Sequence, residues 1–266
     1  MLNARAAFGR AYPRAIGAIR EPSWTFFDVL LPLLGIAAYI YYYRALGADP
    51  AFEGFVVLGG AMTAFWLNVL WGMAAQLYWE KETGNLQLFL VTPMSRMALL
   101  AGMALGGMFA AGIRALSTLL LGILLFNVNM VVVDPLLLVA VFMVTLIAIY
   151  GMGMMFASLF MLYGRDAWNI SNLLQEPIYL VSGFYFPVKA LGPWVSLIAA
   201  VIPITLGLDA MRQELFGPVA NGLMPVVWEL AILVVLAVAF LVMARRSLEY
   251  MEGLGRKEGR LTLRWQ

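Results

Sequence analysis

The sequence predicts an all-α integral membrane protein with six transmembrane helices. Of its 266 residues, 63% are hydrophobic and only 12% are charged, whereas soluble domains carry about 25% charged residues. Apolar segments of about 20 residues, the length that crosses a bilayer core, recur along the chain. A backbone in lipid can satisfy its hydrogen bonds within one segment only as a helix, so we expect these segments to be helical.

A basic segment, residues 1–23, precedes the first apolar run. Phe8 and Tyr12 fall on one helical face, with Arg10 and Arg14 on the opposite face. This pattern is typical of an amphipathic helix at a membrane interface, which we expect on the cytoplasmic side. A basic N-terminus is also typical of signal peptides, but no small-residue cleavage site follows, so we expect an uncleaved first span.

Six apolar segments make up a transmembrane domain over residues 24–244. Trp and Tyr residues, which prefer the headgroup layer, stand at several of their ends. The predicted spans are residues 24–43, 55–79, 97–126, 135–163, 168–186 and 224–244.

The distribution of positive charge sets the orientation. With both termini in the cytoplasm, only Arg44, Lys189 and Arg212 fall on the outer side, as the positive-inside rule requires. The segment after the last span, residues 245–266, becomes a basic cytoplasmic tail. We therefore expect a multi-pass protein of the bacterial inner membrane, in contact with membrane lipids.

An apolar piece between the fifth and sixth predicted spans, residues 191–204, is too short for a normal span. A seventh span there would also move the basic tail to the outer side. We therefore predict a re-entrant or interfacial hairpin on the outer face over residues 187–212. The residues that shape this hairpin are Pro187, Pro193, Trp194 and Pro203.

The residue types present exclude several classes of function. The chain has no Cys and no His, which excludes thiolate and imidazole metal sites and Ser-His catalysis. No Gly-x-x-x-x-Gly-Lys-Ser/Thr phosphate loop occurs, so we expect neither an ATPase site nor a cofactor in this chain. The net charge of +2 is too small to suggest nucleic-acid binding.

The loop between the second and third spans, residues 80–96, is a candidate docking surface. It opens with charges, breaks at Gly84, continues as an apolar run and stops at Pro93, which disfavours helix at the residue before it. An apolar two-turn helix on a loop favours a protein groove as partner, although a capped turn lying on lipid headgroups is the alternative. The candidate residues are Glu80, Glu82, Gly84, Leu86, Leu88, Phe89, Thr92 and Pro93.

This loop is similar to the coupling-helix region of ABC transporter permeases of the type-2 export class, which include drug, lipid and polysaccharide exporters. The region after the fifth span resembles the same family. Its matching motifs are Gly183-Phe184-Tyr185-Phe186-Pro187, Leu191-Gly192-Pro193-Trp194, Ile202-Pro203-Ile204-Thr205 and Asp209-Ala210-Met211-Arg212.

The resemblance implies a membrane subunit that works with a separate ABC ATPase. It implies two ATPase copies, with ATP and Mg bound to them, and a second permease copy or a paralogue. Residues 84–93 would lie in the ATPase cleft, with Glu80 and Glu82 near its surface. The cargo would be amphipathic, lipid-like or lipid-linked, and would move outward.

Polar residues inside the predicted spans form a second candidate site. Arg114 and Glu176 both lie about 12 Å above the inner boundary at 1.5 Å per residue, a shared depth that would allow an ion pair. Asn169, Asn172, Glu176 and Tyr179 fall on one helical face. We interpret these residues as a substrate path or a dimer interface; the alternative is a polar face that is satisfied inside the bundle.

Two other classes of function remain open. An ion-coupled secondary transporter would need titratable residues near the midplane, of which Arg114 and Glu176 are a small supply. A non-transporting subunit of a larger membrane assembly is the other alternative.

Overall fold

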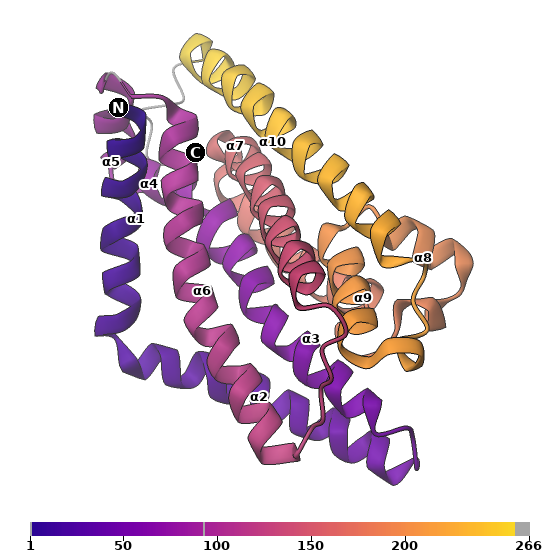
Figure 1. The fold of residues 1–266 in the computed structure, drawn as a ribbon. Coiled ribbons are helices and arrows are strands. Elements are labelled where there is room, and N and C mark those ends of the chain that lie inside the picture. The colour runs from indigo at the N-terminus through magenta and orange to yellow at the C-terminus, as the bar shows by residue number, and fades with distance from the viewer. Residues whose placement is uncertain (1, 93, 259–266) are drawn as a thin grey trace.

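The computed structural model describes residues 2–92 and 94–258, and within them every regular element is a helix. This confirms the all-α prediction (Figure 1). The elements are α1 (Leu2–Arg20), α2 (Pro22–Ala45), α3 (Ala51–Leu67), the π-helix η1 (Asn68–Ala74), α4 (Gln76–Glu82), α5 (Asn85–Val91), α6 (Arg96–Phe126), α7 (Pro135–Val181), the 3-10 helix η2 (Val188–Leu191), α8 (Pro193–Ala199), α9 (Pro203–Phe216), the 3-10 helix η3 (Gly217–Ala220) and α10 (Val226–Lys257).

Five helical segments of the described chain are long and apolar enough to cross a membrane. The central one consists of α3, η1 and α4 in succession and is almost completely buried, because α2, α6, α7 and α9 pack around it. These segments coincide with five of the six predicted spans. They are Pro22–Ala45, Ala51–Glu82, Arg96–Phe126, Pro135–Met161 and Val226–Lys257.

The long helix α7 covers the fourth and fifth predicted spans together. Gly153 packs against Val69 of η1, while Gln175 accepts a hydrogen bond from Trp71 of the same short helix. In a straight helix, positions 153 and 175 would lie roughly 33 Å apart. Since both touch η1, α7 must fold back between them. Only its first half, Pro135–Met161, is among the described segments long and apolar enough to cross a membrane, and the fifth predicted span stays a prediction.

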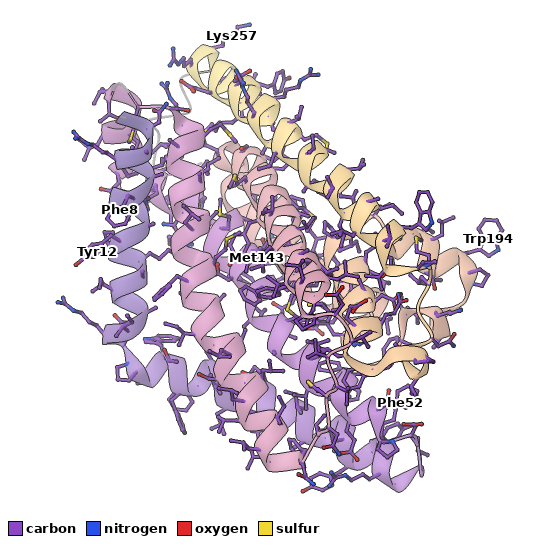
Figure 2. The ribbon with its side chains drawn as sticks, in the orientation of Figure 1. Phe8, Tyr12, Phe52, Met143, Trp194 and Lys257 are labelled. Carbon is purple, nitrogen blue, oxygen red and sulfur yellow. The ribbon has the colours of Figure 1, made fainter. Side chains whose placement is uncertain are left out.

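A bent helix pair occupies the region predicted to be re-entrant. Pro193–Ala199 and Pro203–Ala220 meet at 109°, and Pro193 and Pro203 each stand in the first turn of their helix, where proline costs no hydrogen bond. Pro187 precedes η2, and Trp194 projects from the edge of the bundle (Figure 2). The pair therefore extends the predicted hairpin from residue 212 to Ala220.

The bundle has two distinct ends, which we name by their helices. The α5 end carries α4 and α5, together with the start of α1 and the end of α10; the α8 end carries the bent pair (Figure 1). Helix α10 continues beyond the predicted span into the predicted tail as far as Lys257. The predicted tail residues Arg260 and Arg264 lie outside the described residues.

The amphipathic helix α1 packs lengthwise on α6. Gly102 and Gly106 of α6 meet the backbone of Ala7 and Ala11 so closely that a Cβ on either glycine would overlap it. The aromatic residues of the predicted apolar face, Phe8 and Tyr12, point away from α6 and are exposed (Figure 2), so the opposite, basic face is turned toward the bundle.

Candidate functional site

The predicted loop helix is present at the α5 end. Gly84 has φ +80°, a conformation open to glycine that lets the chain turn between α4 and α5. Thr92 follows α5 in an extended conformation, and its hydroxyl donates a hydrogen bond to the carbonyl of Phe89 (2.8 Å). Pro93, the predicted helix stop, lies outside the described residues.

The side chains of α5 divide into a buried and an exposed set. Leu86 packs into the main hydrophobic core and Phe89 lies half-buried against it. Leu88 is 63% exposed and Val91 is 82% exposed. Two of the predicted docking residues are therefore anchors that fix α5 on the bundle, and an apolar pair, Leu88 and Val91, faces outward.

The carboxylate of Glu80 does not lie at a surface, contrary to the sequence-based expectation. It is buried, pairs with Arg10 of α1 and accepts a hydrogen bond from Gln76 (2.8 Å). The Arg10 guanidinium also lies over the ring of Phe89, 5.4 Å from its centroid. Glu80 thus joins α1 to the α4–α5 loop, while Glu82 is half-exposed.

A polar network that the sequence analysis missed surrounds η1. Arg14 of α1 donates to the carbonyl of Gly72, and Tyr150 of α7 donates to the Asn68 side chain (2.9 Å). Burial lowers the pKa of the Arg14 guanidinium from its ordinary value, and the charge of Arg10 acts in the same direction. The available signal was Asn68, an amide in the middle of a long apolar run.

The polar face of the predicted fifth span points out of the bundle. Asn169, Asn172 and Glu176 are exposed, whereas Tyr179 is half-buried against the ring of Phe184. The alternative of a face satisfied inside the bundle does not fit the three exposed residues. In an apolar environment these exposed polar groups would be costly unless a partner satisfied them.

That exposed face is joined to η1 by a short hydrogen-bonded chain. The Trp71 indole N–H donates to Gln175 (2.8 Å), and the Gln175 amide donates to Glu176 (3.1 Å). The π-helix therefore has the Arg14 network on one side and the polar face of α7 on the other.

Arg114 pairs with Asp28 and not with Glu176, the carboxylate at the same predicted depth in the membrane. Its guanidinium lies 2.5 Å from the Asp28 carboxylate of α2, and Glu176 is on the returning half of α7. Counting residues along a span gives depth but not the direction in which a side chain points, so the Arg114–Glu176 interpretation was wrong. Asp28, a lone acid in the first span, was the missed signal.

The α8 end is held by a buried arginine, which the sequence analysis expected on the outer side of the membrane. Arg212 is 1% exposed and donates to the carbonyls of Phe184 (2.9 Å), Phe186 (3.1 Å) and Phe55 (3.3 Å). Its guanidinium also lies over the Phe55 ring. Arg212 thereby fastens the turn after α7 to the start of α3.

These features define a class: a multi-pass helical membrane protein with a two-turn helix at one end and a bent helix pair at the other. The family model for the ABC-2 type transporter matches residues 14–216, well over half of the chain. The chain therefore belongs to the ABC-2 type transporter family and is a permease subunit, not an ATPase. Permeases of this family normally pair with an ABC ATPase. None of the curated proteins compared with the chain matches it.

Proposed function

We propose that this permease is the membrane subunit of an ATP-driven export pump, and that its ATPase docks on the exposed face of α5. The observation that carries the proposal is the pair Leu88 and Val91, exposed on a short helix whose other side is anchored by Leu86. Apolar side chains on the long helices can face lipid, whereas exposed apolar side chains on a loop helix at the end of the bundle fit a protein groove.

The anchoring of α5 makes it suitable for transmitting force. The ion pair between Arg10 and Glu80 ties α1 to the loop, and α4 continues directly into η1 in the middle of the bundle. A movement imposed on α5 by an ATPase would reach both α1 and the buried π-helix. ATP and Mg would be bound by that ATPase, in two copies, and not by this chain.

The remaining parts of the proposal rest on the family resemblance and on charge. The α5 end would face the cytoplasm of a bacterial cell, with the protein in the inner membrane. Two permease copies, or this chain and a paralogue, would form the path. The exposed polar face of α7, Asn169, Asn172 and Glu176, would lie at the interface or along the route. An amphipathic, lipid-like or lipid-linked cargo would move outward.

A matched pair of double variants tests the docking surface. Leu88→Ser with Val91→Ser removes the exposed face of α5, and Leu197→Ser with Val201→Ser removes an exposed Leu and Val at the α8 end. Each detergent-solubilised protein is isolated with its bound partners, and vanadate-sensitive ATP hydrolysis is measured in the bound fraction.

We expect hydrolysis with the wild type and with the α8-end variant, and a loss of at least tenfold with the α5 variant. Equal loss in both variants would indicate general misfolding. No hydrolysis with the folded wild type would remove the energy source and favour the ion-coupled transporter or the assembly subunit.

A further inference from the structure

An apolar cavity of about 480 Å³ lies between α3, α6, α9 and the first half of α7. Its lining includes Met62 and Phe65 of α3, Met211 of α9 and Met108 of α6. Almost no polar atom reaches its surface. The volume falls within the range of about 300–1,000 Å³ typical of ligand sites, and flexible methionine side chains adapt to irregular apolar ligands.

The cavity opens sideways between two membrane helices. Helices α6 and α7 make few contacts with each other, since α6 packs on α1 and α3 and α7 packs on η1, α9 and α10. Leu116 of α6 and Val139 of α7 line the cavity and are exposed at its rim. Gly112, one turn before Leu116 on α6, also lines the cavity and has no atom within 4 Å of the position that a Cβ would take, so this part of the α6 surface is free of side-chain contacts.

We propose that this cavity binds one acyl chain of a bilayer lipid. The opening lies along segments long and apolar enough to cross a membrane, where the surrounding solvent is hydrocarbon. A cavity without polar groups offers nothing to a charged or hydrogen-bonding ligand, and an alkyl chain fills it with no desolvation cost.

The groups around the cavity change from apolar to more polar toward the α8 end, as a lipid changes from its acyl chain to its headgroup. At the α8 end, Met130 of the α6–α7 connection contributes to the lining. A second pocket, with a larger polar share than the first, shares the Leu215 wall, and its lining includes Glu53, Asn127 and Asn129. Apolar groups toward the middle of the bundle and polar groups toward its end match a chain inserted from the leaflet at the α8 end.

The inference depends neither on the ATPase nor on the direction of transport. It is tested with the full chain alone in liposomes, without ATPase or cargo, and the liposomes contain a phospholipid with a photoreactive diazirine in its acyl chain. After illumination, labelled peptides are identified by mass spectrometry. The informative residues are Met62 and Met211, each 2% exposed, because bulk lipid does not reach them.

Two glycine variants supply the comparison. Gly112→Trp fills the opening, and Gly35→Trp adds the same side chain to α2 at a position with equally free space. We expect label on Met62 and Met211 in the wild type and in Gly35→Trp, and at least fivefold less label there in Gly112→Trp. Labelling of Val235, exposed on α10, should be equal in all three proteins.

Several outcomes would overturn the proposal. Label confined to exposed residues such as Val235 in the wild type would mean that lipid only surrounds the bundle. Unchanged labelling of Met62 in Gly112→Trp would mean that the chain enters elsewhere. Efficient cross-linking of Leu116→Cys between two copies would mean that a second permease covers the opening. Should Gly112→Trp fail to fold, the smaller Gly112→Leu variant tests the same point.

Discussion

Helix α1 and the second half of α7 both carry a polar face in an otherwise apolar bundle. The polar face of α1 points into the bundle, whereas that of α7 points out of it. On α1, Arg10 and Arg14 point inward and find Glu80 and the Gly72 carbonyl. On α7, Asn169 and Asn172 point outward. A polar face that is satisfied within the chain serves its architecture, whereas one that is exposed beside apolar surface requires a partner outside the chain.

The largest effect on stability is expected where the inward face is broken. Arg10→Ala removes the cation that pairs with the buried Glu80 carboxylate, which keeps its hydrogen bond from Gln76. Removing one partner of a buried ion pair lowers the free energy of unfolding by about 3 kcal/mol. The free energy of unfolding in detergent micelles measures this loss. Arg5→Ala, on the exposed side of the same helix, should change it by less than about 0.5 kcal/mol; equal losses would contradict the inward pairing.

A smaller effect is expected at the pair between α2 and α6. In a double-mutant cycle, Asp28→Asn and Arg114→Gln should show a coupling energy of about 1 kcal/mol, within the range found for polar contacts between membrane helices. The parallel cycle of Arg114→Gln with Glu176→Gln should show none. Coupling in the second cycle and not in the first would restore the pairing inferred from depth.

Next in size is the hydrogen bond at the π-helix. Tyr150→Phe leaves the Asn68 oxygen without its donor, and hydrogen bonds between membrane helices contribute about 0.6 kcal/mol on average. Urea or SDS titration of unfolding measures the change. Tyr250→Phe, an exposed tyrosine on α10, is the control, and a similar loss there would show that the Asn68 contact contributes nothing specific.

The smallest stability effect is expected on the outward face of α7. Glu176→Gln and Asn172→Ala should change the free energy of unfolding by less than about 0.5 kcal/mol because both side chains are exposed. They should nevertheless lower export or the association of two copies several-fold, with Leu173→Ala on the neighbouring apolar face as control. Unchanged export and unchanged association would remove this face from the proposed path and interface.

The sequence predicted the positions of the helices but not the direction in which their polar faces point. Hydropathy located four long helices and the start of α10 within a few residues, and Pro193 and Pro203 located the bent pair, because both signals are local. The break at Gly84 located α5 for the same reason. The partners of Glu80 and Arg114 were missed because they depend on which way neighbouring helices turn, and hydropathy carries no information about rotation around the helix axis.

Periodicity predicted the two faces of α1 without showing which one the bundle would bind. In a soluble protein the apolar face would pack inward, but in a membrane the surroundings are apolar and the basic face finds its partners inside. The glycines of α6 permit this close approach, and their role is visible only when both helices are in place.

The inward turn of α1 has a consequence for the order in which the protein is assembled. The acceptor for Arg14 lies 58 residues further along the chain, and Glu80 follows later still, so neither exists when the ribosome releases α1. Until then the guanidinium groups have only water and lipid headgroups, while Phe8 and Tyr12 can enter the bilayer surface. We therefore expect α1 to wait at that surface and to dock after the helices Ala51–Glu82 and α6 have inserted. A helix that is made before its partners would thus dock only after they are in place.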